Sequence, residues 1–523
     1  MSDVDQPPSI AAMIRRNAER FPDSDAILGD GRSATFSDLD ERSSRVAAGL
    51  VAAGVGVGDR VAYLARNATE YWELFFGAAK AGAAIVPLNF RLAAGEIEWI
   101  LGDAAPAALV AEEHLVGLVP AAYDGLRLLF SQDGAPAGHA GWTDLEEWIG
   151  AAPATDPHRE VEGDGLLSLI YSSGTTGRPK GVTTSVEAML WAVEAFGSQF
   201  SPSPETVSLV PTPYYHVAAG GWSLLALNAG GTIVQFTEVT PPLLLDHLVR
   251  YRATHVIMVP TLIQLFITSP EAKAADYSSV QRVVYGGSPI SETVMIGAKE
   301  VFGADLTQSY GLTETIGVTT VLGPDDHVVG AGSKLRSAGR AVPGVEIAIL
   351  DAETGEPVAD GVVGEICTRA RCVTQGYWRR PEETAAAYWP GGWFRTGDAG
   401  YMDADGYVFI MDRIKDLLMS GGENIYPAEV ENAIMAHPAV QEVAVIGIPS
   451  EKWGETPLAV VVPRVGMTID SAELIAFTRE RLAHYKCPTA VEVLDALPRN
   501  PSGKILKREL REPWWAGQDR RVG

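Results

Sequence analysis

Residues 171–182 read YSSGTTGRPKGV and continue a short apolar run at residues 166–171, LLSLIY. A nearly continuous apolar run of this length is typical of a buried strand. In the loop that follows, the glycines let backbone N–H groups approach a ligand closely, the hydroxyl side chains add donors, and Lys180 adds a mobile positive charge. This combination predicts a cradle for an anion, and the natural ligand of such a cradle is a polyphosphate.

The loop differs from the common P-loop, in which Gly-Lys-Ser/Thr leads straight into a helix. Here Lys180 is followed by Gly181 and Val182, and Pro179 restricts the backbone before it. An isolated GTTG is more often an ordinary surface turn, because Gly, Ser and Thr are common in connections between elements. The interpretation as a phosphate loop therefore depends on other motifs in the chain.

The composition is that of a large acidic globular protein. Its 523 residues are too many for one hydrophobic core, so several domains are expected. The net charge of −25 disfavours nucleic acid and anionic membranes as partners, because both reward clustered Lys and Arg. Three cysteines without metal-ligand spacing fit a reducing compartment, and no apolar run reaches the roughly 18–20 residues of a membrane span. We therefore expect a cytoplasmic protein without an integral membrane segment.

The order of the apolar runs predicts the α/β class. Residues 10–111 alternate helical and strand patterns, which favours parallel sheets covered by helices, and a second α/β region follows over residues 187–309. After Gly330, short alternating strands with frequent glycines indicate a β-rich subdomain. From Lys415 on, the pattern is α+β again.

The expected architecture is an α/β protein with a large N-terminal domain and a small mobile α+β C-terminal domain. The N-terminal domain, residues 1–412, would consist of stacked α/β subdomains plus the β-rich subdomain, and residues 413–523 would form the C-terminal domain. Ser37 is expected to cap a helix whose apolar face includes Leu50. The segment after Arg511 is expected to be a loosely held tail.

The phosphate-loop stretch resembles that of the acyl-adenylate-forming superfamily, which includes acyl-CoA synthetases, firefly luciferase and nonribosomal adenylation domains. Further stretches resemble motifs of the same superfamily in its usual order: YGGSPI at 285–290, QSYGLTE at 308–314, TGD at 396–398, DRIKD at 412–416 and PRNPSGKILKREL at 498–510. Each motif is weak alone. Together they cover nearly the whole chain, and the family that it resembles most is that of the acyl-CoA synthetases, including the fatty-acyl-CoA ligases.

This resemblance implies a nucleotide site for ATP and Mg²⁺. It places the Tyr310 ring against adenine, Thr313 at the α-phosphate and Glu314 on the Mg²⁺ ion, since a hard cation prefers carboxylate oxygens. It also implies that Asp398 accepts hydrogen bonds from the two ribose hydroxyls with help from Arg413. The implied ATP- and AMP-binding residues are Ser172, Ser173, Gly174, Thr175, Thr176, Gly177, Lys180, Gly286, Gly287, Ser288, Gln308, Ser309, Tyr310, Gly311, Thr313, Asp398, Ile410, Arg413 and Lys504, and the implied metal residues are Glu314 and Thr176.

By the same resemblance, Lys504 is the adenylation lysine, which would touch the substrate carboxylate and the α-phosphate as charge builds there. The other implied catalytic residues are His216, Thr313 and Glu314. In the family the small domain rotates between two reaction steps about a hinge that corresponds here to Lys415. The rotated domain presents a tunnel for coenzyme A, implied here at Ser420, Gly421, Gly422 and Glu423.

The stretch PTPYYHVAAGGW at residues 211–222 marks the expected acyl pocket. The family usually has a Phe-His pair where Tyr215 and His216 stand, and His216 would lie beside the substrate carboxylate. The small residues that follow leave room for a bulky or long apolar acid, such as a fatty acid or a terpenoid or steroid-derived acid, and benzoate-type acids stay open. The expected pocket residues are Tyr215, His216, Ala218, Ala219, Gly220, Gly221, Tyr285 and Gly286.

The implied function is that of an ATP-dependent acyl-CoA ligase that works through acyl-AMP and releases AMP and pyrophosphate. One alternative is an adenylation enzyme that loads a carrier protein, although no Asp stands near residues 215–217 to hold the α-ammonium group of an amino acid. Another is an inactive acyl-adenylate-binding protein, which predicts the loss of a key residue. None is lost: the chain keeps Lys180, Glu314, Asp398 and Lys504. The family resemblance also favours a homodimer.

Overall fold

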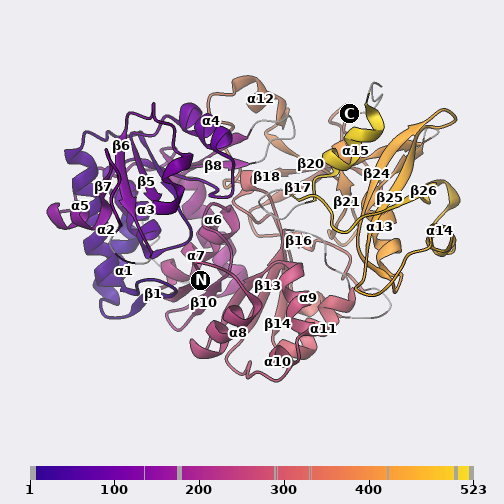
Figure 1. Cartoon of the computed structure of the whole chain (residues 1–523), viewed down its shortest axis with the longest axis horizontal. Coiled ribbons are helices and arrows are strands. Elements are labelled where there is room, and N and C mark those ends of the chain that lie inside the picture. The colour runs from indigo at the N-terminus through magenta and orange to yellow at the C-terminus, as the bar shows by residue number, and fades with distance from the viewer. Residues whose placement is uncertain are drawn as a thin grey trace. The chain divides into compact units, whose positions relative to one another are not determined.

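The computed structural model describes residues 8–132, 134, 136–172, 179–287, 290, 292–328, 330, 333–420, 423–499 and 505–516 (Figure 1). The chain divides into two compact units, of which the first is Met1–Ile347 with Thr368–Phe394 and the second is Ala348–Cys367 with Arg395–Gly523. Three strands begin in one unit and end in the other: β17 (Glu346–Leu350), β18 (Gly364–Arg369) and β20 (Trp393–Met402). The predicted domain boundary between residues 412 and 413 is a hinge position. The two compact units do not show where the chain bends, so this boundary stays a prediction.

One sheet of the first unit has seven strands in the order β7-β6-β5-β3-β4-β8-β9. Its strands are β3 (Arg60–Leu64), β4 (Ala84–Pro87), β5 (Ala108–Glu112), β6 (Leu126–Phe130), β7 (Thr143–Asp144), β8 (Leu166–Ser172) and β9 (Lys180–Ser185). Neighbouring strands are parallel except β8 and β9, which are antiparallel. The predicted buried strand before the phosphate loop is therefore confirmed as β8, and its antiparallel partner is β9.

The other sheet of the first unit has nine strands in the order β16-β15-β14-β13-β12-β10-β11-β1-β2. Its strands are β1 (Asp25–Gly29), β2 (Ala34–Thr35), β10 (Val207–Val210), β11 (Thr232–Gln235), β12 (His255–Met258), β13 (Arg282–Gly286), β14 (Asp305–Tyr310), β15 (Thr320–Leu322) and β16 (Arg340–Ala341). The central strands β11, β10, β12, β13 and β14 are parallel to one another. This parallel arrangement confirms the predicted α/β class.

Helices cover both faces of both sheets, and the alternation of side chains along each strand decides which core a residue joins. In β3, Val61 and Tyr63 join the core between the two sheets, whereas Ala62 and Leu64 pack toward α4. The helices around the core between the sheets are α1 (Ile10–Arg20), α2 (Phe36–Ala52), α3 (Thr69–Ala81), α5 (Leu145–Ala151), α6 (Val186–Phe200) and α7 (Val217–Ala229). The helices on the outer faces are α4 (Ala94–Ala104), α8 (Pro241–Arg250), α9 (Pro260–Thr268), α10 (Pro270–Lys273) and α11 (Glu292–Phe302), the last four beside β13 and β14 in Figure 1. The first unit also holds α12 (Pro381–Ala386) and β19 (Tyr388–Trp389).

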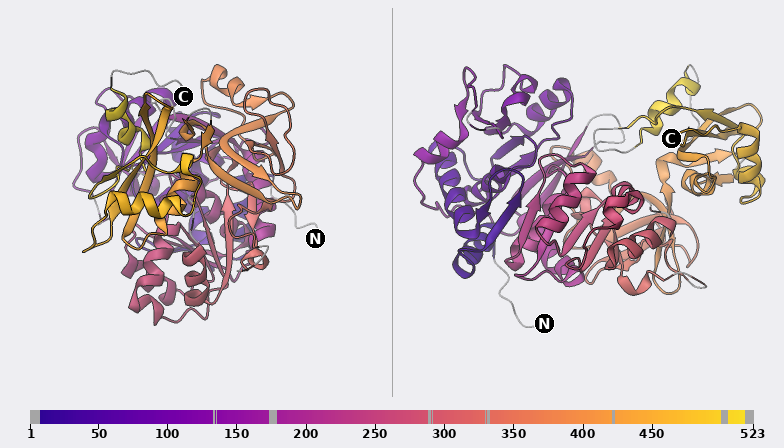
Figure 2. Two further views of the ribbon diagram at one scale, coloured as in Figure 1. Left: turned by 90° about the vertical axis from the view of Figure 1, so that its right-hand side faces the viewer. Right: turned by 60° about the horizontal axis from the view of Figure 1, so that its bottom comes forward.

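The second unit, drawn in orange to yellow in Figure 2, is built on a five-stranded sheet. The strands of this sheet are β22 (Leu418–Ser420), β23 (Glu423–Ile425), β24 (Val440–Ser450), β25 (Gly454–Pro463) and β26 (Ala490–Val493). The unit also holds β21 (Val408–Arg413), which pairs with β20 in another sheet, and the helices α13 (Pro427–Met435), α14 (Ser471–Arg479) and α15 (Lys507–Trp515). The order of the sheet is β23-β22-β25-β24, and β26 pairs with β25 in parallel. A mixed sheet with helices confirms the predicted α+β character of the C-terminal part, while its mobility stays a prediction.

Two local predictions were wrong, the first because Thr35 and Asp38 form a local capping box and the second because a tertiary contact holds the segment. The cap of α2 is Thr35 and not Ser37: Thr35 Oγ1 accepts the Asp38 N–H (3.1 Å), and Asp38 Oδ2 accepts the Thr35 N–H (3.0 Å). Residues 512–516 are not a loose tail, since residues 512–515 continue α15 and the Trp515 indole donates to the Gly447 carbonyl (2.9 Å), while residues 517–523 lie outside the described residues.

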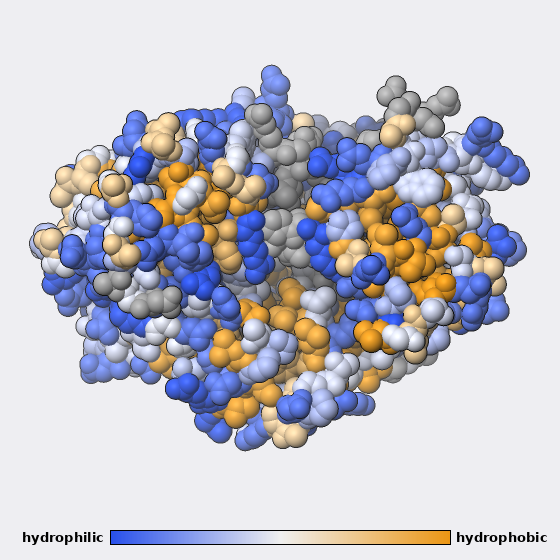
Figure 3. Space-filling view, in the orientation of Figure 1, coloured by the Kyte–Doolittle hydropathy of each residue, from blue (hydrophilic) through white to orange (hydrophobic). Residues whose placement is uncertain are grey.

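Hydrophilic residues cover much of the face that Figure 3 shows. The helices of the described segments include none with both the length and the apolar character that a membrane crossing needs. The three cysteines, Cys367, Cys372 and Cys487, are buried free thiols. Burial raises the pKa of both Cys367 and Cys372 to about 12.

The cap formed by Thr35 and Asp38 predicts that alanine substitutions at Thr35 and at Ser37 differ in their effect on stability. Thr35→Ala should lower the free energy of unfolding by about 1 kcal/mol, because the Asp38 N–H loses its acceptor. Ser37→Ala should change it by less than about 0.5 kcal/mol, because Ser37 is exposed and lies inside the helix. Urea unfolding of the two variants checks this, and an equal loss in both would contradict the assignment of the cap.

Candidate active site

Lys180 lies at the start of β9, where it pairs with Ser172 at the end of β8. Its ammonium lies 5.0 Å from the centroid of the Tyr377 ring. The other predicted loop residues, Ser173, Gly174, Thr175, Thr176 and Gly177, lie outside the described residues. The structure thus brings the two ends of the predicted phosphate loop together and places the lysine beside an aromatic ring.

Glu314 lies in a short 3-10 turn, η2 (Thr313–Thr315), after β14. Its Oε1 accepts a hydrogen bond from Tyr377 Oη (3.0 Å), and its backbone carbonyl accepts one from the Thr374 N–H (2.7 Å). Burial, together with the nearby Glu314 charge, raises the pKa of Tyr377, so the hydroxyl stays protonated and donates. Tyr377 therefore contacts two predicted site residues, Lys180 and Glu314.

The predicted adenine-side residues lie at the carboxyl ends of two neighbouring parallel strands. Gly286 at the end of β13 pairs with Ser309 of β14, and a Cβ at Gly286 would lie 2.3 Å from the Ser309 carbonyl oxygen. Only glycine permits this approach. Gln308, Tyr310 and Thr313 follow along the same edge, while Ser288 lies outside the described residues.

Along this carboxyl edge, the order of the sheet reverses between β10 and β12. The chain passes from β10 to β11 on one side and then to β12, β13 and β14 on the other side. In open α/β sheets, ligands bind beyond the carboxyl ends of the strands at such a reversal. Residues 211–222, which contain the predicted acyl-pocket motif, begin directly after β10.

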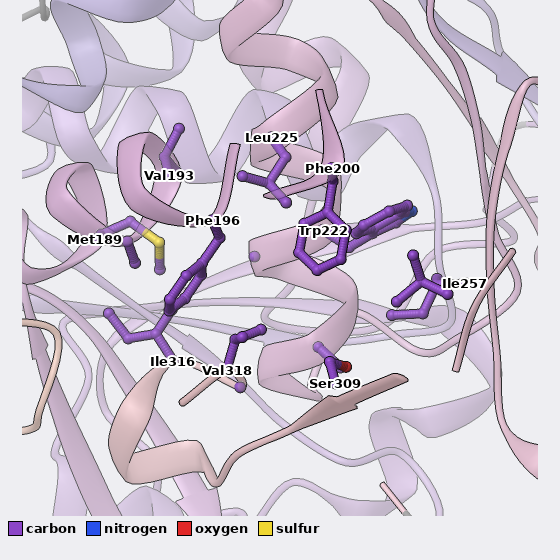
Figure 4. Close-up of a pocket in the computed structure, with 15 residues that line it drawn as sticks. Met189, Val193, Phe196, Phe200, Trp222, Leu225, Ile257, Ser309, Ile316 and Val318 are labelled. Carbon is purple, nitrogen blue, oxygen red and sulfur yellow. The ribbon is translucent and has the colours of Figure 1, made fainter. Parts of the chain in front are cut away.

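A cavity opens at this edge (Figure 4). Phe196 and Phe200 reach it from α6, Trp222 and Leu225 from α7, and Ser309 from the end of β14. The remaining lining residues are Met189, Ala192, Val193, Ala218, Gly221, Ile257, Val284, Ile316, Gly317 and Val318. Since nearly all of these side chains are apolar, the cavity suits an apolar group.

The predicted pocket residues lie partly in this lining. Ala218 and Gly221 line the cavity, whereas Ala219 is fully buried in the core and Gly220 lies outside the lining. The Tyr285 ring faces away from the cavity, because alternate residues of a strand point to opposite faces and it is Val284 that lines it. Tyr285 is instead buried in the core around α9 and α11, and its hydroxyl lies 2.7 Å from His327 Nε2.

His216 is the N-cap residue of α7, and its ring centroid lies 4.5 Å from that of Tyr215. Tyr215 is 7% exposed and packs edge-on against Phe90. Tyr215 Oη has no hydrogen-bond partner among the residues that the structure describes. The neighbouring Tyr214 is also buried, but its hydroxyl donates to Gln235 Oε1 (3.0 Å).

In the second unit, the predicted ribose residues form one compact arrangement across β20 and β21. Asp398 pairs with Arg413 in register, and Arg413 Nε lies 2.7 Å from Asp398 Oδ1. The Asp398 N–H donates to Thr396 Oγ1 (3.1 Å), and the carboxylate is only 5% exposed. Ile410 lies on β21 opposite Gly400. The structure thus holds the Asp398 carboxylate in one orientation.

The remaining predicted residues of the second unit are described only in part. Lys415 lies in the 3-10 turn η4 (Ile414–Asp416), and Ser420 pairs with Glu423 across the β22–β23 hairpin. Gly421, Gly422 and Lys504 lie outside the described residues. The chain is described again from Ile505, which pairs with Arg499.

Two groups of residues in this region have no counterpart among the sequence-based predictions. The first is the set of cavity-lining residues from α6, which carry no motif; an apolar helix face directly after β9 is the available signal. The second is Tyr377, whose Gly-Tyr-Trp context resembles an ordinary turn. Only the pairing of that segment with β9 brings Tyr377 to Lys180.

Comparison with known proteins gives matches over almost the whole chain. The family model for AMP-binding enzymes matches residues 14–378, and the model for the AMP-binding enzyme C-terminal domain matches residues 429–504. The chain is 38% identical to the fatty acid–[acyl-carrier-protein] ligase ScoC of Streptomyces coeruleorubidus, covering 97% of this chain and 96% of that protein. It is 39% identical to a feruloyl-CoA synthase of Amycolatopsis sp, covering 95% and 97%. The crystal structure of ATP-bound MatB from Rhodopseudomonas palustris matches with a TM-score of 0.87 at 31% identity, covering 96% of this chain and 99% of that one.

The two neighbouring tyrosines predict opposite effects of the same substitution. Tyr215→Phe should raise the free energy of unfolding by about 1 kcal/mol, because it removes a buried hydroxyl that has no partner among the described residues. Tyr214→Phe should lower it by about 1 kcal/mol, because Gln235 loses a hydrogen bond. Chemical denaturation of both variants measures the difference, and a loss of stability in Tyr215→Phe would show that its hydroxyl is paired in solution.

Proposed function

Because the chain belongs to the AMP-binding enzyme family and is an AMP-forming acid–thiol ligase, we propose that its acid is large and apolar and that its thiol is coenzyme A. The observation that carries this proposal is the apolar cavity at the carboxyl ends of the parallel strands. Its lining is apolar except for Ser309, which suits the apolar part of a substrate acid.

The reaction consists of two transfers. A carboxylate oxygen of the acid attacks the α-phosphorus of ATP, the bond to pyrophosphate breaks, and acyl-AMP forms. The thiolate sulfur then attacks the acyl carbon, the bond to AMP breaks, and the thioester forms. The protein holds the reacting groups in line and balances charge as it develops.

We assign the residues that would bind adenine, the phosphates and the ribose from their positions in the two units. In the first unit, we assign adenine to the ends of β13 and β14, with Gly286 and Tyr310, and the phosphates to Lys180 and Thr313. Close backbone packing at Gly286 supports a flat ligand at this edge. In the second unit, we assign the ribose hydroxyls to Asp398, whose carboxylate Arg413 orients.

Glu314 fits the Mg²⁺ ion that the family implies. Tyr377 holds its Oε1, and within the described segments no hydrogen bond engages its Oε2, which leaves that oxygen for a hard cation. Bound there with the phosphates, Mg²⁺ would neutralise charge on the polyphosphate. Thr176, the other expected metal residue, lies outside the described residues.

The acid would place its apolar part in the cavity between α6 and α7. A small acid such as acetate would forgo most of the dispersion contacts that the apolar lining offers. The similarity to a feruloyl-CoA synthase and to a fatty acid ligase agrees with either an aromatic or an aliphatic acid of substantial size. We propose that His216 lies beside the substrate carboxylate, since it follows β10 at the reversal of the sheet.

Two molecules are candidates for the thiol that accepts the acyl group. Coenzyme A is favoured by the similarity to a CoA synthase, and its tunnel is assigned to residues 420–423. A carrier protein is the alternative, because the chain is also 38% identical to a ligase that uses an acyl-carrier protein. Both acceptors would present a pantetheine thiol, so the same cavity and the same acyl-AMP serve either.

We propose that the enzyme works in the cytoplasm, as a homodimer. Three buried and unbridged cysteines agree with a reducing compartment. The homodimer rests on the family resemblance and is tested directly by size-exclusion chromatography with light scattering.

A panel of acids tests the proposed function. With MgATP and coenzyme A, kcat/KM should rise about fourfold for each added methylene of a linear acid, because each buried methylene contributes about 0.8 kcal/mol, until the cavity is filled. Pyrophosphate release measures the first transfer, and mass spectrometry identifies the thioester. Lys504→Ala is the matched inactive control. A preference for acetate would contradict the large apolar acid, and acyl-AMP that coenzyme A never discharges would point to a carrier protein.

Two adjacent glycines of α7 test the assignment of the cavity. A side chain at Gly221 would start in ordinary contact with Ile316 (3.7 Å to its carbonyl oxygen) and grow into the cavity, whereas a Cβ at Gly220 meets open space. Gly221→Leu should therefore lower kcat/KM for the best large acid about tenfold, as expected for overpacking. Gly220→Leu should leave the preference among acids unchanged. Equal effects of the two variants would exclude this cavity as the acyl site.

A further inference from the structure

The segment at residues 374–378 runs alongside β9, although it lies far away in the sequence. The Thr183 N–H donates to the Gly376 carbonyl (3.1 Å), and the Trp378 N–H donates to the Gly181 carbonyl (2.8 Å). Between these bonds, Tyr377 pairs with Val182 in an antiparallel bridge. The segment is thus an additional strand-like partner of β9, directly after Lys180.

The backbone at Tyr377 is held from its other side as well. Its N–H donates to Thr384 Oγ1 (2.9 Å). Gly376 has φ +139, and a Cβ there would lie 2.3 Å from Thr384 Cγ2, so a glycine is needed for this approach. These bonds on both sides fix the backbone of Tyr377 and limit the directions in which its side chain can point.

In that direction it reaches both charged residues assigned to MgATP. Its hydroxyl donates to Glu314 Oε1 (3.0 Å), and its ring lies 5.0 Å from the Lys180 ammonium. The two contacts use different parts of the side chain, the oxygen for Glu314 and the ring for Lys180. They can therefore be removed separately.

Each contact prepares its residue for a ligand. A hydrogen bond to one oxygen of a metal-binding carboxylate fixes its orientation, and loss of such a partner typically weakens metal binding about 10- to 100-fold. A cation near an aromatic ring is attracted to its electron-rich face, which limits the freedom of a long lysine side chain. A residue that is ordered in advance loses less entropy when its ligand binds.

Building on the proposed function, we propose that Tyr377 is a positioning residue for MgATP. Its hydroxyl orients the Glu314 carboxylate for the metal, and its ring holds Lys180 for the phosphates. The two parts of one side chain thereby hold the metal-binding and phosphate-binding groups at a fixed separation before the nucleotide arrives.

Two substitutions at Tyr377 separate the two roles. Tyr377→Phe keeps the ring and removes the hydroxyl, so ATP binding in EDTA should stay unchanged while binding of MgATP weakens about tenfold. Tyr377→Leu also removes the ring, so ATP binding in EDTA should weaken as well, about threefold. Titration calorimetry measures both affinities without turnover. The Mg²⁺ concentration for half-maximal pyrophosphate release should rise by a similar factor in Tyr377→Phe, with the KM of the acid unchanged.

Tyr388→Phe is the matched control. The Tyr388 hydroxyl donates to the Thr374 carbonyl, so it supports the same segment without bonding to Glu314. This variant should bind MgATP as the wild type does. Thermal unfolding of all variants verifies that each is folded at the temperature of the titrations.

A second control uses Glu314→Gln. If the Tyr377 hydroxyl acts through the Glu314 carboxylate, adding Tyr377→Phe to Glu314→Gln should cause no further loss of MgATP affinity. An additive further loss would overturn the assigned route through Glu314.

The outcomes distinguish this inference from the proposed function. Wild-type affinity for MgATP in Tyr377→Phe would overturn the inference, and so would an equal loss in Tyr388→Phe, which would trace the effect to the packing of the segment. Failure of the wild-type enzyme to release pyrophosphate with any acid would instead overturn the proposed function. In that case the calorimetry still decides whether Tyr377 positions a nucleotide–metal site.

Discussion

The hydrogen bonds on both edges of β9 are the constraint on which the rest of the candidate site depends. On one edge β9 pairs with β8, so the chain returns beside its own phosphate-loop strand. On the other edge residues 376–378 bond to residues 181–183. Because backbone hydrogen bonds have restricted geometry, the bonds on the two edges fix the backbone positions of Lys180 and Tyr377 relative to each other. The turn that carries Glu314 is joined to the same segment through the Thr374 N–H.

The cavity depends on a different constraint, the alternation of side chains along parallel strands. Val284 and Tyr285 are neighbours in β13, yet one lines the cavity and the other belongs to the core on the opposite face. The helices α6 and α7 close the space above the strand ends with aromatic side chains, among them Phe196 and Trp222. The reversal of strand order leaves room there, because the helical connections diverge to the two sides of the sheet.

The sequence predicts the elements that have a strong local signal. The apolar run at residues 166–171 marks β8, and the alternating pattern over residues 10–111 corresponds to helices and strands of the first unit. The family resemblance assigns Gly286 and Ser309 to one nucleotide site, and the structure pairs them on the neighbouring parallel strands β13 and β14. These predictions succeed because period and turn chemistry are properties of short segments.

What the sequence does not predict depends on contacts between distant segments. The last helix is held by Trp515 against Gly447, a strand residue that no local pattern connects to it. The lining from α6 and the position of Tyr377 arise in the same way. In each case the deciding partner is a residue that becomes a neighbour only after folding.

The three buried cysteines have a consequence for chemical selectivity. An acyl-adenylate is a mixed anhydride that transfers its acyl group to thiolates, and a thiolate on the protein surface would compete with the intended acceptor. Burial removes Cys367, Cys372 and Cys487 from contact with solvent and raises the pKa of each thiol, so very little thiolate exists near neutral pH. The enzyme is thereby protected from acylating its own cysteines, and the activated acyl group is kept for the substrate.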